Sequence, residues 1–297
     1  MTDLLTTTNL SKSFGSLLVI NSFHMNLKRG EALGIIGPNG AGKSTFINIL
    51  GGSVIKTEGE VNVWGFDLDK NPRQVRASIG IVPQEVNLDA FFSPRKLLEL
   101  QAGLYGVPKK NRITDTILKM VSLEKQAESY SRSLSGGMKR RLLIAKAMVH
   151  QPPILVLDEP TAGVDVELRR NLWENVKNLN KQGVTIILTT HYLFEAQEMS
   201  NRIAILNKGN LVALDTTKNL LNRIKTKKIT FKINGSFDIK KKEIHGLIIT
   251  SNVNNEITIS YERDKHKIED IIAIIKNEGV EIVDISTDDG NLEDVFI

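Results

Sequence analysis

The residues with the clearest chemical meaning form a glycine-rich segment, Gly37-Pro-Asn-Gly-Ala-Gly-Lys43-Ser44. It matches the pattern G-x-x-x-x-G-K-[ST], in which backbone N–H groups surround a chain of phosphates. A glycine turn with an incidental lysine is the alternative, but an apolar strand before the loop and a helix from about Thr45 favour the phosphate site. We expect Lys43 to reach the terminal phosphates and Ser44 to bind Mg²⁺. The candidate phosphate-binding residues here are Gly37, Pro38, Asn39, Gly40, Ala41, Gly42, Lys43, Ser44 and Thr45.

Two adjacent acids could complete such a site. Asp158 and Glu159 follow the apolar run Ile154-Leu-Val-Leu, which predicts a buried strand ending at the carboxyl edge of a sheet. Asp158 is a candidate Mg²⁺ ligand, and Glu159 could polarise the water that attacks the γ-phosphate. Taken alone, a pair of acids before Pro160 also serves as a helix cap. The phosphate loop makes the metal and base roles the favoured interpretation.

A second candidate anion site lies at Leu134-Ser135-Gly136-Gly137-Met138, directly before a helical stretch. By itself this segment is an N-cap with a flexible turn. The start of the helix could also bind an anion. The spacing does not say whether the two loops share one ATP molecule.

In this order, the motifs resemble those of an ATP-binding cassette ATPase, the motor subunit of ABC transporters. The resemblance covers residues 1 to about 221 and implies an α/β fold, with a mainly parallel sheet core, an antiparallel β subdomain and a helical insertion. It also implies ATP and Mg²⁺ as ligands, and a head-to-tail homodimer. Each ATP would then lie between one chain's phosphate loop and the partner's Ser135, Gly136 and Gly137.

The resemblance assigns roles to four further residues. Gln84 matches the glutamine that senses Mg²⁺ and the attacking water, and His191 matches the histidine that contacts the γ-phosphate. Asp165 matches the loop that crosses the dimer interface, and Phe14 matches the aromatic residue that stacks on adenine. Judged without the family, Gln84 suits a polar loop equally well, and Asp165 suits a helix cap or a turn. A histidine at a strand end is more often structural, and a phenylalanine usually belongs to a core.

Two departures from the family pattern occur. Met138 stands where glutamine is most familiar, and Ala162-Gly-Val-Asp165 replaces the commoner Ser-Ala-Leu-Asp. The segment Leu134-Ser-Gly-Gly-Met138 resembles the family's signature, and the first change keeps the backbone N–H groups of this signature. The second change affects the contacts expected before Asp165. Neither change removes a catalytic group.

The surrounding sequence alternates short apolar runs with helical patterns, as expected for an α/β domain. Leucine, lysine and glutamate dominate between Phe92 and Tyr130, which predicts a helical insertion. We expect an ATPase domain at residues 1–221, with a helical subdomain at about 88–150, and a β-rich accessory domain of α+β type at 222–297. The expected strands lie at 31–36, 78–82, 154–157, 184–190 and 202–206, and in the tail at 229–233, 256–261 and 280–285, with a tail helix at 268–275.

Composition limits the possible functions. The 297 residues include no cysteine, which excludes disulfides, thiolate metal sites and a cysteine nucleophile. No apolar run approaches the roughly 20 residues that span a bilayer, and the start of the chain lacks the pattern of a signal peptide. The net charge of +5 is compatible with nucleic acid or an anionic membrane surface and decides neither. A role at a membrane would require another, membrane-spanning chain.

The C-terminal extension is similar to ATPases of the ABC-2 type export group. This resemblance implies an ATP-hydrolysing subunit that powers a separate integral membrane permease from the cytoplasmic face of the bacterial inner membrane, without nucleic acid. Phe91, Phe92 and Tyr105 are candidates for a permease-docking groove, although aromatic residues there also suit a core. The tail could regulate, contact a partner, or simply stabilise the chain.

Two alternatives remain at this stage. A soluble ABC-type regulatory ATPase could act on RNA or ribosomes, a role to which the basic run Lys240-Lys-Lys would be suited. A nucleotide-binding scaffold without activity is disfavoured because Lys43, Asp158, Glu159 and His191 are all present.

Overall fold

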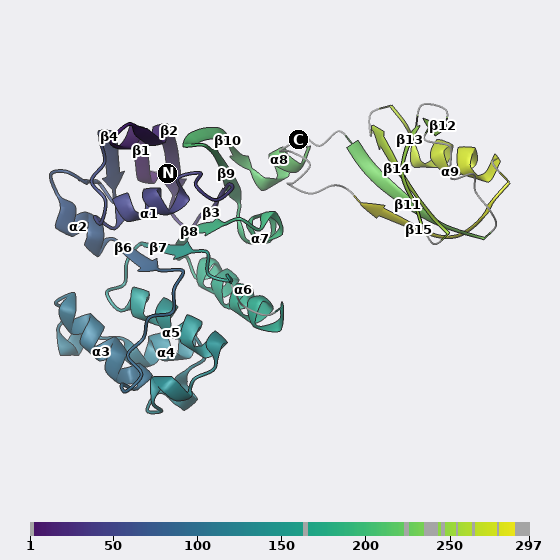
Figure 1. The fold of residues 1–297 in the computed structure, drawn as a ribbon. Helices are drawn as coiled ribbons and strands as arrows, with labels where there is room; N and C mark the ends of the chain where they lie inside the picture. The colour runs from purple at the N-terminus through teal and green to yellow at the C-terminus, as the bar shows by residue number, and fades with distance from the viewer. Residues whose placement is uncertain are drawn as a thin grey trace. The chain divides into compact units, whose positions relative to one another are not determined.

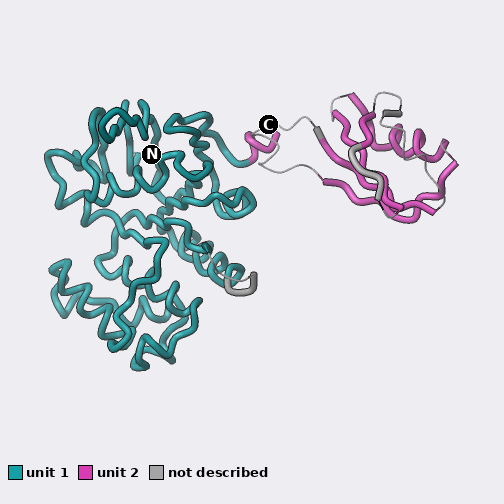
Figure 2. The backbone as a smooth tube through the Cα atoms, viewed as in Figure 1, with its two compact units in different colours: residues 1–217 teal, residues 218–297 magenta. Residues whose placement is uncertain are grey.

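The chain divides into two compact units, residues 1–217 and 218–297 (Figure 2). The computed structural model describes residues 3–162, 166–222, 226–234, 243–244, 247–253, 255–262, 265–277 and 279–288. Within these ranges, no helix is both long and apolar enough to cross a bilayer.

A six-stranded sheet forms the centre of the first unit, in the order β10-β9-β3-β8-β7-β6 (Figure 1). Five of its strands run parallel, and β10 joins one edge antiparallel to β9. The strands are β3 (Ala32–Ile36), β6 (Ile79–Val82), β7 (Ile154–Asp158), β8 (Thr185–Thr190), β9 (Arg202–Asn207) and β10 (Asn210–Thr216). The parallel strands lie close to the apolar runs identified in the sequence, because a sheet covered on both faces needs near-continuous apolar strands.

Successive residues of the central strands pack into two different cores. Leu155 and Leu157 belong to the core that includes the helical insertion. Ile154 and Val156, which alternate with them, belong to a second core on the other face of the sheet. Side chains alternate along a strand with a period of two, so each strand contributes to both cores.

The second core is completed by a four-stranded antiparallel sheet, in the order β2-β1-β4-β5, and by helix α1. Phe23 of this sheet packs against Phe46 of α1, with ring centroids 5.1 Å apart. The elements are β1 (Asp3–Phe14), β2 (Leu17–Lys28), β4 (Glu58–Val63), β5 (Phe66–Asp67), α1 (Lys43–Leu50) and α2 (Pro72–Ala77). The antiparallel subdomain expected from the family resemblance is thus present.

The first core joins the sheet to the predicted helical insertion, which forms a lobe of the first unit (Figure 1). Helix α3 begins at Pro94, where a missing N–H costs nothing, and Ser93 caps it by accepting a hydrogen bond from the Lys96 N–H. The lobe contains α3 (Pro94–Leu104), η1 (Lys109–Asn111), α4 (Thr114–Met120), η2 (Glu124–Gln126), η3 (Ser131–Ser133) and α5 (Gly136–Met148). Helices α6 (Val166–Lys181), α7 (Leu193–Met199) and α8 (Thr217–Asn222) follow later in the chain.

The second unit is a five-stranded antiparallel sheet, in the order β12-β13-β14-β11-β15, with helix α9 over one face. Ile271 and Ile275 of α9 are buried against alternate residues of β11 and β14. The elements are β11 (Thr226–Asn234), β12 (Glu243–Ile244), β13 (Leu247–Val253), β14 (Glu256–Glu262), α9 (Ile268–Asn277) and β15 (Glu281–Asp288). The basic run Lys240-Lys-Lys lies outside the described residues.

The face of this sheet opposite α9 carries paired charges. Lys232 on β11 lies opposite Asp284 on one neighbouring strand and opposite Glu256 on the other, and Lys228 lies opposite Asp288. Cross-strand neighbours of opposite charge attract one another. The lysines of β11 therefore do not form a uniformly basic surface.

Candidate nucleotide site

The glycine-rich loop connects β3 to α1, and its backbone requires glycine. Gly40 and Gly42 have φ angles of 80° and 104°, in the left-handed region that side chains disfavour. A Cβ atom on Gly42 would also lie 2.8 Å from the carbonyl oxygen of Val19. Helix α1 begins at Lys43, two residues before the expected start near Thr45. The loop thus leads directly into a helix N-terminus, which suits anion binding.

Lys43 points back into this loop and is only 5% exposed. Its Nζ donates hydrogen bonds to the carbonyl oxygens of Gly37, at 2.7 Å, and Pro38, at 3.2 Å. Glu159 Oε1 lies 3.8 Å from the same nitrogen. Burial lowers the pKa of the Lys43 ammonium, and the Glu159 and Asp158 carboxylates act against that shift.

Asp158 is the last residue of β7 and faces the loop. Its Oδ1 accepts a 2.5 Å hydrogen bond from the Thr189 hydroxyl on the adjacent strand β8. Burial raises the pKa of the Asp158 carboxyl, while hydrogen bonds from Thr189 and Ser44 oppose the shift. The Ser44 hydroxyl and the Asp158 carboxylate are therefore close, hard oxygen donors, which fits Mg²⁺. No cluster of three metal-ligating side chains occurs among the described residues, so phosphate oxygens and water would complete such a site.

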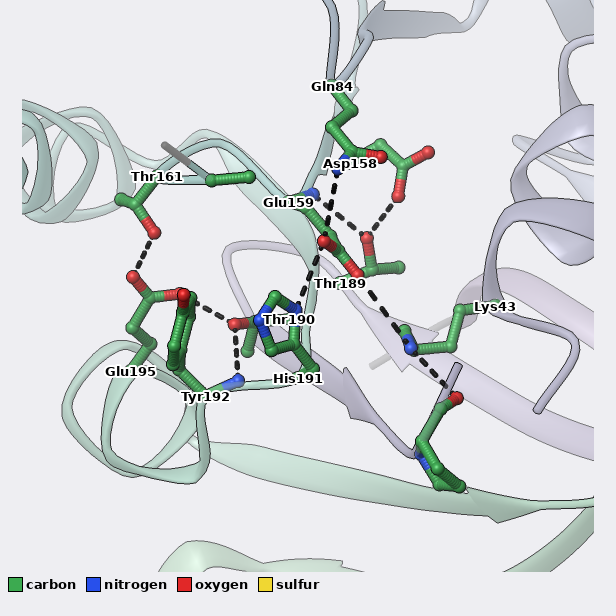
Figure 3. Close-up of polar contacts among 12 residues, drawn as sticks. Lys43, Gln84, Asp158, Glu159, Thr161, Thr189, Thr190, His191, Tyr192 and Glu195 are labelled. Atoms are coloured by element: carbon green, nitrogen blue, oxygen red, sulfur yellow. Dashed lines mark hydrogen bonds and ion pairs between the residues drawn. The ribbon is translucent and has the colours of Figure 1, made fainter. Parts of the chain in front are cut away.

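Glu159 lies where three other candidate site residues, Lys43, Gln84 and His191, converge (Figure 3). Its Oε2 accepts a hydrogen bond from Gln84 Nε2 at 3.3 Å and lies 3.1 Å from His191 Nδ1. The backbone at Glu159 is left-handed, with φ 42°, and its N–H donates to the Thr189 carbonyl at 3.0 Å. A left-handed residue with a side chain costs about 1–2 kcal/mol, so this conformation is held by its surroundings.

These side chains surround a cavity of about 580 Å³. It is lined by Val19, Asn39, Gly40, Ala41, Gly42, Lys43, Ser44, Thr45, Gln84, Glu159, Ala162, His191 and Tyr192. Phe14 is not among the lining residues. The residue is 49% exposed, and the Lys12 Nζ lies over its ring, 4.5 Å from the ring centroid. Asp165 lies outside the described residues.

The signature segment opens on a different cavity. Ser135 caps α5 by accepting a hydrogen bond from the Met138 N–H at 3.3 Å. Ser135 and Gly137 line a separate cavity of about 420 Å³ together with residues of α6. Within one chain, the structure does not bring these residues into the cavity beside the phosphate loop.

The structure adds residues that sequence analysis missed. Thr189 bonds both Asp158 and the Glu159 backbone, and Arg140 of α5 bonds the Gln84 and Ala162 carbonyl oxygens. Buried Glu195 accepts hydrogen bonds from Thr161 and Thr190, which flank the site. Thr189 lies in the run that ends at His191, which the sequence shows. The pairing of β7 with β8, which places Thr189 beside Asp158, could not be seen in the sequence.

A separate groove lies on the helical lobe. Phe91 and Phe92 line it together with Tyr130, and Phe91 is 70% exposed. Arg132 lies over both the Phe91 and Tyr130 rings. Tyr105 is not among the lining residues of this groove. Its ring instead stacks on His150 with centroids 3.8 Å apart.

A largely parallel sheet, a phosphate loop leading from β3 into a helix, and two acids at the end of β7, with β8 between these two strands, define a P-loop nucleotide-hydrolysing protein. The profile of the ABC transporter family matches residues 20–162. The chain belongs to this family, among its ATP-binding proteins of exporter type, and it is an ATPase.

Several curated relatives are similar to this chain. The linearmycin resistance ATP-binding protein LnrL of Bacillus subtilis (strain 168) is 36% identical over 73% of this chain and 70% of its own length. The Nod factor export ATP-binding protein I of Rhizobium sp. (strain N33) is 40% identical over 69% of this chain and 68% of its own length. Its namesake from Cupriavidus pinatubonensis is 30% identical over 100% of this chain and 90% of its own length.

Solved structures agree with this family. The ATP-binding cassette MJ0796, in a dimeric post-hydrolysis state bound to ADP and Pi, matches with a TM-score of 0.61 and 29% identity, over 72% of this chain and 98% of that one. cbiO1 from Clostridium perfringens, part of the ABC transporter complex cbiONQ, matches with a TM-score of 0.68 and 26% identity. The match covers 76% of this chain and 95% of cbiO1. These comparisons do not support the alternative of a regulatory ATPase acting on RNA or ribosomes.

Proposed function

We propose that this protein is the ATP-hydrolysing subunit of an ABC-2 type exporter and works as a homodimer on a separate integral membrane permease. The observation that carries the proposal is the convergence of Lys43, Gln84 and His191 on the Glu159 carboxylate, beside the phosphate loop. Relatives named for export and for resistance support an exporter. The proposed site of action is the cytoplasmic face of the bacterial inner membrane.

In this proposal, Glu159 polarises the attacking water and takes its proton as the water oxygen bonds the γ-phosphorus. Lys43 and the backbone N–H groups of Gly37 and residues 39–42 stabilise the negative charge that moves to the leaving oxygen. His191, which already lies against Glu159, contacts the γ-phosphate. Phe14 is retained as the proposed adenine contact, through the ring face opposite Lys12.

Magnesium fits the oxygen donors at this site. Ser44 and Asp158 would hold the ion, with Gln84 as a further ligand, and the ion would supply charge neutralisation at the phosphates. Two carboxylates otherwise face the phosphates, since Asp158 lies beside Ser44 and Glu159 Oε1 lies 3.8 Å from Lys43 Nζ. A divalent cation would therefore reduce their repulsion of the triphosphate.

The two separate cavities support a dimer. Ser135, Gly136 and Gly137 stand at the N-terminus of a 13-residue helix, which suits a phosphate group, but none of them lines the cavity at the chain's own phosphate loop. A second copy arranged head to tail would supply them in trans, and Asp165 would lie in the loop that meets the partner. The dimeric cassette among the similar structures supports this arrangement.

A complementation experiment tests the shared site. Lys43→Ala damages the phosphate loop and Ser135→Arg blocks the signature, so each variant alone should hydrolyse ATP poorly. In a mixture, one of the two sites of a heterodimer combines an intact loop with an intact signature, and activity should reappear. Each variant at doubled concentration is the control. A mixture no more active than these controls would refute the shared site.

We further propose that the groove containing Phe91 and Phe92 receives the permease. Its mix of exposed aromatic rings and charged side chains suits a short amphipathic helix. Replacing both phenylalanines by serine should abolish co-purification with an integral membrane permease and leave basal ATP hydrolysis unchanged. Tyr105→Ser, which changes a residue outside the groove lining, is the matched control.

A further inference from the structure

Arg140 is a buried cation in the first turns of α5, only 8% exposed. Its Nη1 donates to the Gln84 carbonyl at 2.5 Å, and its Nη2 donates to the Ala162 carbonyl at 2.9 Å. Among the described residues, no carboxylate forms an ion pair with it. Burial lowers the pKa of the guanidinium, so the position costs free energy. The buried guanidinium therefore binds only two neutral carbonyl groups among the described residues.

Both acceptors adjoin Glu159. The Gln84 side chain donates to Glu159 Oε2 at 3.3 Å, and the Ala162 N–H donates to the Glu159 carbonyl at 3.1 Å. One planar guanidinium thus joins the loop on one side of the glutamate to the turn on its other side. A rigid fork can fix the separation of two carbonyl groups in a way that the single ammonium of lysine cannot.

We propose that Arg140 is a positioning residue for ATP hydrolysis, which holds Gln84 and the segment Glu159–Ala162 at the separation that orients the Glu159 carboxylate. Arg140 follows the Ser135 cap by five residues on the same helix. A shift of the signature helix would therefore be transmitted to the glutamate through this one side chain. The inference rests on the proposed role of Glu159 as the group that polarises water.

Arg140→Lys tests the proposal, because lysine keeps the charge but loses the fork. A misplaced catalytic group costs on the order of 100-fold in rate, so kcat should fall by about 10- to 100-fold. The KM for ATP should stay close to that of the wild type, because Arg140 does not line the cavity at the phosphate loop. Rates are divided by the number of nucleotide-binding sites, so that loss of folded protein does not count as loss of catalysis.

Arg202→Lys is the matched control. Arg202 also donates to a backbone carbonyl, that of Asn26, and it lies at the amino end of β9, away from the cavity. Both lysine variants should lower the urea midpoint of unfolding, but only Arg140→Lys should lower kcat. If Arg140→Lys destabilises the protein and keeps the wild-type kcat, the residue is merely structural and the proposal is wrong. Arg140→Met, which removes both donors, should have a kcat no higher than that of the lysine variant.

A double-mutant cycle shows whether Arg140 acts through Glu159. In a Glu159→Gln background, Arg140→Lys should change the residual rate little, because the group it positions is already disabled. Equal effects in both backgrounds would overturn the inference. If Glu159→Gln alone hydrolyses ATP at the wild-type rate, the proposed role of Glu159 fails instead, which is a distinguishable result.

Discussion

Glu159→Gln is the most direct perturbation of the proposed chemistry. The substitution keeps the side chain's size and one oxygen that can accept the hydrogen bond from Gln84. It removes the charge that lies 3.8 Å from Lys43 Nζ and 3.1 Å from His191 Nδ1. The cavity should keep its shape, so the variant separates the chemical step from binding.

The expected loss of rate follows from the role of a general base. Such a group contributes about 10²- to 10⁴-fold, which corresponds to about 2.7–5.4 kcal/mol in the activation barrier. Affinity for ATP should be retained or increased, because the Glu159 carboxylate competes with phosphates for the Lys43 ammonium. The variant should therefore accumulate with ATP bound and with its dimer closed.

Single-turnover hydrolysis and equilibrium binding of a fluorescent ATP analogue measure the two effects separately, and size-exclusion chromatography with ATP detects the dimer. Glu198→Gln is the control, since Glu198 is an exposed glutamate on α7 that pairs with Lys177. Its rate and affinity should equal those of the wild type. A Glu159→Gln rate within a factor of about three of the wild type, far short of the 10²-fold minimum, would refute the assignment.

Three further predictions concern the loop and the cores. Gly42→Ala should weaken ATP binding, measured by equilibrium titration, by about 5- to 30-fold, as expected for 1–2 kcal/mol of backbone strain. Gly65→Ala is the control, because Gly65 also has a positive φ, 80°, but an added Cβ there would meet no neighbouring atom, so ATP affinity should stay unchanged. Leu155→Ala should lower the free energy of unfolding by about 2.7–5 kcal/mol in urea, because a fully buried side chain leaves a cavity. Burial lowers the pKa of His150 in the folded protein, so acidification from about pH 6.5 should reduce stability until the lowered pKa is passed. His150→Phe should show a smaller loss than the wild type between pH 7 and 5.5; an equal loss would contradict the prediction.

The sequence predicted the parts of this site that lie within single segments. The phosphate loop, the Asp158–Glu159 pair and the strands before them are each set by local pattern, and the structure has the expected elements close to their expected bounds. Gln84 and His191 were found through family resemblance. Their hydrogen bonds to Glu159 are consistent with the proposed roles.

Contacts between segments could not be predicted from local patterns. The Thr189 bond to Asp158 depends on β8 lying beside β7, which is a property of the sheet order. Arg140 follows the signature in sequence, yet its acceptors lie 56 residues before it and 22 residues after it. Tyr105 was expected in the docking groove because it is aromatic. The structure stacks it on His150, and only tertiary packing could reveal this.

The alternation of side chains along β7 has a consequence for how the first unit can move. Leu155 and Leu157 belong to the core of the helical lobe, while Ile154 and Val156 belong to the opposite core. Local unfolding of the lobe would expose the part of this sheet face that the lobe covers, and the cost rises with the apolar area exposed. The lobe should therefore respond to nucleotide by turning as an intact body, and hydrogen exchange in its helices should be as slow as in the strands beneath them.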